Sequence, residues 1–260
     1  MRIAGSSLIY SRLGLEAACD RLSDLGFDAV DVAMQEDWAH VDPSDAVGAV
    51  DETAECVDAA CRSAGLDPVA LNVSAGDVPL DVEAERIDAV VDVAAALDVD
   101  VLTLPAASTD ASLADDLDRF RTLVDVAADR AVTLTVETHW GTHTEDPAVA
   151  AEYVASVPGL GYTLDPGHFV VGDHSLDRAM ADLLDDVAHV HLRQAGTGWA
   201  EIQLPVDEGR IDVASVVESL RESGYDRTLT VEYIDSLDGV APDAAERQAD
   251  AFRTALDAVV

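Results

Sequence analysis

The sequence contains no lysine, and its fifteen basic residues are all arginine. Without a lysine amine, the chain cannot form a Schiff base or supply the phosphate-contacting lysine of a P-loop. This absence excludes class I aldolases, pyridoxal enzymes and P-loop NTPases.

Positive charge is scarce, with 15 basic residues against 52 acidic ones and a formal net charge of −37. Because nucleic-acid phosphates are bound largely by Lys and Arg, this balance argues against a nucleic-acid partner. Hydrophobic residues make up 49% of the chain, which is too many for a disordered acidic protein. We interpret the acidic residues as a solvated surface whose mutual repulsion is tolerable where a high salt concentration screens it. We therefore expect a cytoplasmic location in a halophile with a high-salt cytosol.

The chain also lacks long apolar runs and paired cysteines. No uncharged apolar stretch reaches the length of about 18 residues needed to span a membrane, and the first residues lack the pattern of a secretion signal, so we expect neither export nor a membrane partner. The three cysteines, Cys19, Cys56 and Cys61, lack the spacing of a structural zinc site. We expect them to pack in the core.

What the sequence does contain is a regular alternation of β-branched runs and amphipathic Ala/Leu/Val-rich stretches, which is typical of repeated βα units. Eight such units predict a single (β/α)8 TIM barrel domain over residues 1–260. The predicted strands are Arg2 to Ser6, Phe27 to Ala33, Pro68 to Ser74, Val99 to Leu104, Val132 to Glu137, Gly161 to Asp165, Val187 to Arg193 and Thr228 to Tyr233.

A doubly wound sheet is the alternative fold for this alternation. It would be expected to carry a Gly-rich phosphate turn after its first strand, and the chain has Gly5-Ser6-Ser7-Leu8 there. Two predicted loops are long, 34–50 and 194–211. Both would lie at the carboxyl ends of the strands, where TIM-barrel enzymes have their active sites.

Four consecutive predicted strands carry an ionisable residue at or near their carboxyl ends: Glu137, Asp165, His191 and Glu232. Side chains alternate along a strand, and the residues that alternate with these four are apolar. The four are therefore predicted to point into the barrel mouth. Three converging carboxylates repel one another unless a cation lies between them.

Mostly oxygen ligands with one imidazole suit Mn²⁺, Mg²⁺ or Co²⁺ better than a structural zinc ion, although Zn²⁺ is a further candidate. We predict one divalent metal ion per chain.

Four motifs resemble those of the xylose isomerase-like TIM barrels, the sugar phosphate isomerase/epimerase group: Val136-Glu137-Thr138-His139, Leu164-Asp165-Pro166-Gly167-His168, His189-Val190-His191-Leu192-Arg193 and Gly224-Tyr225-Asp226 with Leu229-Thr230-Val231-Glu232-Tyr233. The resemblance implies that Glu137, Asp165, His191 and Glu232 are metal ligands. It implies that Glu137 and Glu232 are also acid/base catalysts and that His168 binds substrate oxygens.

An enzyme of this kind is expected to isomerise or epimerise a small-molecule sugar or polyol through an enediolate, with the two carboxylates shuttling the proton. The family usually has His-x-Lys-Asp where this chain has His191-Leu192-Arg193-Gln194. Arginine keeps the positive charge, but Gln194 removes a carboxylate. Because a chain without lysine offers few phosphate ligands, an unphosphorylated substrate is favoured.

Further candidates surround these residues. Arg193, His139, Asn72 and Trp38 are predicted to bind substrate, while Trp140 and Trp199 are interpreted either as aromatic walls or as loop anchors. His189, one inward step below His191, is expected to be a buried partner rather than a ligand.

Two other functions stay open. An inosose dehydratase-like enzyme would use the same site to expel a β-hydroxyl from a keto-polyol. Endonuclease IV-like DNA repair shares the fold but needs a multi-metal cluster with more histidines and a basic groove; the sequence predicts neither, so this function is less favoured. A homo-oligomer is compatible with the sequence.

Overall fold

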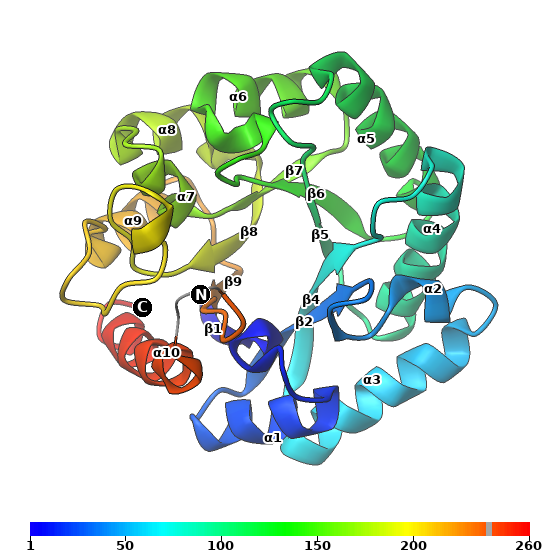
Figure 1. The fold of residues 1–260 in the computed structure, drawn as a ribbon, viewed down its shortest axis with the longest axis horizontal. Coiled ribbons are helices and arrows are strands. Elements are labelled where there is room, and N and C mark those ends of the chain that lie inside the picture. The colour runs from blue at the N-terminus through cyan, green and yellow to red at the C-terminus, as the bar shows by residue number, and fades with distance from the viewer. Residues whose placement is uncertain (238–240) are drawn as a thin grey trace.

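The computed structural model describes residues 1–237 and 241–260. Eight parallel strands close into a barrel surrounded by helices (Figure 1), which confirms the predicted (β/α)8 fold. Closure occurs at β1 (Arg2–Ser6), which pairs with both β2 (Ala29–Gln35) and β9 (Thr228–Val231).

The remaining strands follow in chain order around the barrel and all lie within two residues of their predicted bounds. They are β4 (Asp67–Ser74), β5 (Val101–Pro105), β6 (Thr133–Glu137), β7 (Gly161–Leu164) and β8 (Val187–Leu192). A short β3 (Ala39–His40), which was not predicted, pairs antiparallel with β2 inside the long 34–50 loop. Asp165, Arg193 and Glu232 lie one residue beyond their strands, in the loops that form the mouth.

Helices cover the outside of the barrel because each has one apolar face. In α1 (Leu15–Asp24), the buried residues Leu15, Ala18, Cys19 and Leu22 repeat at helical spacing. The others are α3 (Val50–Ala64), α4 (Leu80–Ala96), α5 (Leu113–Ala127), α6 (Pro147–Ser156), α8 (Leu176–Leu183), α9 (Val213–Glu222) and α10 (Pro242–Asp257), with short α2 (Pro43–Ala46) and α7 (Pro166–Val171) in loops. Cys19 and Cys61 are buried as expected, but Cys56 is exposed, so its predicted core position is wrong.

The barrel interior contains a layer of hydroxyl groups beneath the mouth. The Oγ1 atom of Thr163 lies 2.7 Å from that of Thr103 and 2.6 Å from that of Thr135. The alternating residues Leu134, Val136 and Leu164 are buried in the apolar layer outside the barrel. This agrees with the predicted alternation and directs the strand-end acids into the mouth. Over the described ranges, no helix combines the length and apolar character needed to cross a membrane.

Candidate active site

A cavity of about 350 Å³ opens at the carboxyl ends of the strands. Its lining includes all seven residues that were predicted as catalytic or substrate-binding: Glu137, Glu232, His168, Arg193, His139, Asn72 and Trp38. The other two predicted metal ligands, Asp165 and His191, are fully buried and contact lining residues. The structure thus brings the predicted set together around one space.

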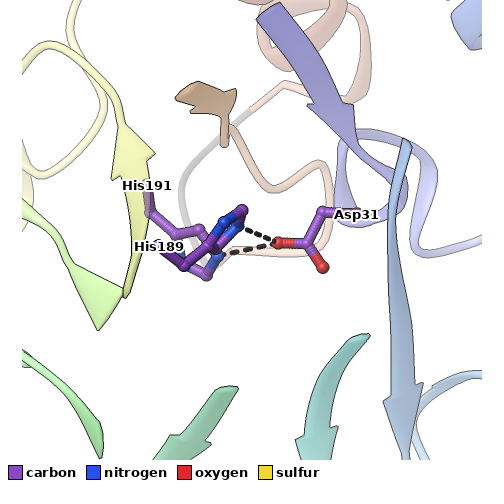
Figure 2. A group of neighbouring side chains, drawn as sticks. All are labelled: Asp31, His189 and His191. Atoms are coloured by element: carbon purple, nitrogen blue, oxygen red, sulfur yellow. Dashed lines mark hydrogen bonds and ion pairs between the residues drawn. The ribbon is translucent and has the colours of Figure 1, made fainter. Parts of the chain in front are cut away.

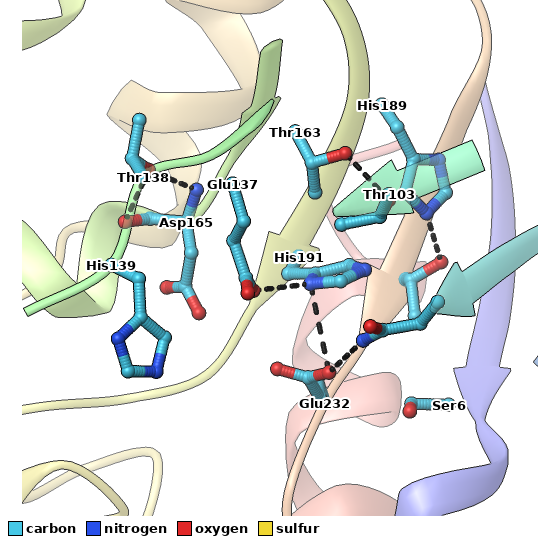
Figure 3. Close-up of polar contacts among 12 residues, drawn as sticks. Ser6, Thr103, Glu137, Thr138, His139, Thr163, Asp165, His189, His191 and Glu232 are labelled. Atoms are coloured by element: carbon cyan, nitrogen blue, oxygen red, sulfur yellow. Dashed lines mark hydrogen bonds and ion pairs between the residues drawn. The ribbon is translucent and has the colours of Figure 1, made fainter. Parts of the chain in front are cut away.

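Glu137, His191 and Glu232 form the first part of the site (Figure 3). The Nδ1 atom of His191 lies 2.8 Å from Oε1 of Glu137 and 3.6 Å from Oε1 of Glu232. All three residues are buried, and their ligand-type atoms lie within 4.8 Å of one another. The carboxylates from the ends of β6 and β9 therefore meet at one imidazole nitrogen.

Asp165 and Arg193 form the second part. Nε and Nη2 of Arg193 donate to Oδ2 of Asp165, at 2.9 and 2.6 Å, and Nη2 also donates to Oε2 of Glu232. The other oxygen of Asp165 accepts from the backbone N–H of Gly167 at 2.7 Å, as the N-terminal cap of α7. Arg193 thus offsets the charge of two of the predicted metal ligands.

Burial and neighbouring charge change the acidity of these groups in opposite directions. Burial raises the pKa of Glu232 to about 7, against the opposing effects of His191 and Arg193. Burial is also the largest single influence on Glu137, but the hydrogen bond and charge of His191, together with the charges of His139 and Arg193, outweigh it and lower the pKa of Glu137. Two carboxylates with separated pKa values are typical of acid/base pairs.

His168 lines the cavity and has one ring nitrogen without a hydrogen-bond partner in the part of the chain that the structure describes. Its Nδ1 atom accepts from the backbone N–H of Trp140 at 3.1 Å, so the neutral ring carries its proton on Nε2. Burial holds the pKa of His168 well below its ordinary value. Nε2 is buried and has no hydrogen-bond partner among the described residues, while Oδ2 of Asp165 lies 3.6 Å away. A substrate oxygen is the kind of partner that this N–H lacks.

Asp31, in β2, was not predicted and joins both histidines of β8 (Figure 2). Its Oδ2 atom lies 2.9 Å from Nε2 of His189 and 2.9 Å from Nε2 of His191. Because Nε2 of His191 contacts Asp31, Nδ1 is the atom directed toward Glu137 and Glu232. His189 is buried beside His191 as expected: its Nε2 atom contacts Asp31 and Thr230, and its ring lies edge-on to that of His191, with the ring centroids 5.2 Å apart. A sequence signal existed, since an acid inside a fully buried strand needs a partner.

Asn72 and Gln35 support Glu232 from the opposite side of the barrel. Nδ2 of Asn72, the chain's single asparagine, donates to Oε1 of Glu232 at 3.2 Å. Nε2 of Gln35, which was not predicted, donates to Oδ1 of Asn72 at 3.0 Å. Asn72 therefore lines the cavity as predicted and also orients a catalytic candidate.

The departure at Gln194 has a structural explanation. Its Nε2 atom donates to the backbone carbonyls of Val206 and Ile211, and its Oε1 atom accepts from the backbone N–H of Ile211 at 2.9 Å. An aspartate cannot donate these hydrogen bonds. The glutamine thus fastens the 194–211 loop and does not line the cavity.

The donor set fits a divalent cation. Among the described residues, three groups have ligand atoms within 4.8 Å of one another: Asp31 with His189 and His191, Glu137 with His191 and Glu232, and Glu137 with Asp165 and His168. The last two share Glu137 and together contain the four predicted ligands. The donors are carboxylate oxygens and imidazole nitrogens, which suit Mn²⁺, Mg²⁺ or Co²⁺. Because Arg193 pairs with Asp165 and Glu232, a cation bound by all four would compete with its guanidinium.

Comparisons with known proteins agree with this geometry. The model of the xylose isomerase-like TIM barrel family matches residues 19–255. Among solved structures, a D-allulose 3-epimerase from Methylomonas sp. is 15% identical, with a TM-score of 0.75 and coverage of 100% of this chain and 97% of that one.

A 3-keto-D-glucoside 4-epimerase from E. coli is 20% identical, with a TM-score of 0.70 and coverage of 98% and 99%. A probable 3-DHS dehydratase from Bacillus anthracis is 14% identical, with a TM-score of 0.74 and coverage of 97% and 99%. These likenesses show the fold. A search of curated protein sequences finds no match.

Proposed function

We propose that this chain, which belongs to the xylose isomerase-like TIM barrel family, is a divalent-metal-dependent isomerase or epimerase of a sugar or sugar derivative. The observation that carries the proposal is the meeting of two buried carboxylates, Glu137 and Glu232, in one cavity beside a buried imidazole. Proton transfer at a carbon next to a carbonyl needs a base and an acid at one substrate atom, and this pair supplies both roles.

The metal would be held by Glu137, Asp165, His191 and Glu232. When bound, it would supply positive charge where negative charge develops on the substrate oxygens. The support for this assignment is the donor chemistry and the proximity of the ligand atoms.

The chain's own residues perform the proton transfer. One of Glu137 and Glu232 removes the proton from the carbon next to the carbonyl. The other returns a proton to the same carbon in an epimerisation, or to its neighbour in an isomerisation. Asn72 limits the rotation of Glu232, and His191 limits that of Glu137.

His168 and Arg193 orient the substrate. The free Nε2–H of His168 donates to a hydroxyl or carbonyl oxygen, and Arg193 places a buried positive charge beside both Asp165 and Glu232. A hydrogen-bond donor that is fixed before substrate arrives stabilises developing negative charge with little rearrangement.

A dehydratase that acts on a keto-polyol is the second candidate. Removal of the same proton can lead to loss of a β-hydroxyl, and the likeness to a probable 3-DHS dehydratase favours this possibility. The two candidates share the first proton removal and differ in what leaves the substrate.

Product NMR in D₂O distinguishes them. The protein, purified in molar KCl because of its charge of −37, is supplied with Mn²⁺, Mg²⁺ or Co²⁺ and a panel of ketoses, aldoses and inososes. Deuterium at the carbon next to the carbonyl of a recovered or rearranged sugar supports the isomerase or epimerase. Loss of water supports the dehydratase, and neither product on any substrate contradicts both.

A further inference from the structure

All three tryptophans of the chain surround the mouth of the cavity. Trp38 and Trp199 line it, and Trp140 stacks on Trp199 with a ring separation of 5.4 Å and an interplanar angle of 19°. Their exposed fractions are 48% for Trp38, 38% for Trp140 and 40% for Trp199. Since tryptophan is usually well buried, exposure of the whole set at one opening calls for an explanation.

The loop that presents Trp38 has an unusual backbone. Asp37 and His40, on either side of the tryptophan, have φ angles of 59° and 63°, a region that costs a residue with a side chain about 1–2 kcal/mol. The backbone N–H of Asp37 donates to Oδ1 of Asp42 at 2.8 Å, and that of Trp38 donates to the carbonyl of Gln35 at 3.0 Å. The turn is thus held in a strained form that places an apolar ring at the mouth.

The loop that presents Trp199 is equally well fixed. Gly198, which precedes it, has a φ of 87°, and its N–H donates to the carbonyl of Val171 at 2.9 Å. The N–H of Gly196 donates to the carbonyl of Glu201 at 2.8 Å, which closes the turn around Trp199. The ring is therefore positioned by backbone hydrogen bonds on both sides.

A series of rings joins the exposed tryptophans to the buried end of the site. The ring centroid of Trp199 lies 6.2 Å from that of His168 and 6.3 Å from that of His139, and the centroids of the two histidine rings are 3.9 Å apart. His168 in turn lies against Asp165. One wall of the cavity is thus aromatic from the carboxylate cluster to the surface.

The cavity is divided into a polar inner end and a mainly apolar outer end. Glu137, Glu232, Arg193 and Asn72 provide the inner hydrogen-bonding groups. The more exposed part of the lining is mainly apolar and includes Trp38, Trp199 and the half-buried Ile234 and Leu237, with the half-buried Ser74 and Thr142 among them. A free monosaccharide has hydroxyls around its whole rim, so it matches only the inner end.

We propose that the tryptophans form an outer subsite that binds a second sugar ring, so that the substrate is a disaccharide or other glycoside rather than a free monosaccharide. A pyranose ring has an apolar C–H face that packs on indole while its hydroxyls stay solvated. Because the chain has a formal net charge of −37, a neutral sugar ring is favoured over an anionic group at the outer subsite. This inference rests on the proposed function, because it takes the inner end to be the place of reaction.

The test compares binding of D-fructose with binding of its glucosylated forms, maltulose and isomaltulose, by calorimetry in molar KCl with and without Mn²⁺. At least one disaccharide is expected to bind roughly tenfold more tightly than D-fructose, which corresponds to about 1.4 kcal/mol. Trp38→Ala and Trp199→Ala should each remove most of this preference, so that the ratio of the disaccharide affinity to the D-fructose affinity falls toward one.

Two variants serve as controls. Trp199→Phe keeps an aromatic face and should retain most of the preference. Val260→Ala truncates a similarly exposed apolar residue at the other end of the barrel and should change nothing.

Equal binding of D-fructose and both disaccharides, unchanged by the alanine variants, would overturn the subsite. So would a Trp199→Ala variant that alters the oligomeric state in sedimentation while keeping the sugar preference, since the rings would then be an interface between copies.

The outer subsite and the proposed function can be contradicted independently of each other. Deuterium exchange into D-fructose with no disaccharide preference would overturn the subsite and leave the proposed function standing. Tryptophan-dependent disaccharide binding without exchange or other turnover in the presence of Mn²⁺ would support the subsite and contradict the proposed function.

Discussion

The two ends of the barrel offer cavities of similar size and related chemistry. The amino-end cavity has a volume of about 300 Å³ and includes Arg2 and Asp28 in its lining, whereas the carboxyl-end cavity has about 350 Å³. In each, one arginine pairs with two acids: Arg2 with Asp28 and Asp67, and Arg193 with Asp165 and Glu232. Neither volume nor ion pairing distinguishes the ends.

Burial of the charges does distinguish them. The side chains of the Arg2 group are 39–75% exposed, while those of the Arg193 group are at most 3% exposed. Exposed pairs remain hydrated and contribute little stability, but a buried ion pays a desolvation cost of several kcal/mol. A fold does not need buried charges at its carboxyl end, so their burial there supports the proposed active site.

The largest expected effect is on the reaction itself. Glu232→Gln removes a proton-transfer group and should lower the rate of deuterium exchange by roughly 10²–10⁴-fold, with an unchanged circular dichroism spectrum. Glu208→Gln, at an exposed glutamate, is the matched control. Near wild-type exchange in Glu232→Gln would remove the proposed catalytic role.

The second largest expected effect is a loss of stability in the metal-free protein. Arg193→Gln leaves Asp165 and Glu232 without their buried cation and should lower the free energy of unfolding by about 3–5 kcal/mol in denaturant titrations. Added Mn²⁺ should restore part of this loss. If the loss matched that of Arg2→Gln, the contrast between the two ends would not hold.

A smaller effect is expected at Asp31. Asp31→Asn removes the charge that contacts both β8 histidines, and should weaken Mn²⁺ affinity by about 10–100-fold, the usual range for groups that orient a ligand. In the metal-free protein, ¹⁵N NMR should show a redistribution of the proton between the nitrogens of His191. Asp28→Asn, at an exposed acid, is the control; an unchanged affinity in Asp31→Asn would show that its contacts are only structural.

The smallest effect is expected at the amino end. Arg2→Gln breaks exposed pairs and should cost roughly 0.2–1 kcal/mol of unfolding free energy at low salt, with less in molar KCl because salt screens exposed charges. Activity should not change. If Arg2→Gln lost more unfolding free energy than Arg193→Gln, the exposed ion pairs at the amino end would contribute more stability than the buried ones at the carboxyl end, contrary to this prediction.

The sequence predicted the fold and the positions of most candidate site residues because both follow from short-range patterns. Strand alternation placed Glu137 and His191 on inward faces, and barrel closure then brought β6, β8 and β9 to one mouth. Glu232 was located correctly although it lies one residue past β9, because loop residues at a strand end still face the opening.

Contacts across the barrel were harder to predict. Asp31 is separated from His189 by 158 positions in the sequence. Because valines flank Asp31, the segment around it has the pattern of an ordinary core strand. The pairing of Arg193 with Asp165 and Glu232 depends on side-chain rotamers that no spacing rule fixes. The alternative roles of Trp199, wall or anchor, were separated only by the exposure of its ring and its place in the cavity lining.

The most direct test of the central claim is a Mn²⁺ titration of the chelator-stripped protein followed by electron paramagnetic resonance. It is done in molar KCl so that the exposed acids are screened. The account predicts saturation at one tightly bound ion per chain, with loss of that binding in both Glu137→Gln and Asp165→Asn. No saturable binding, or a bound ion that both variants retain unchanged, would contradict it.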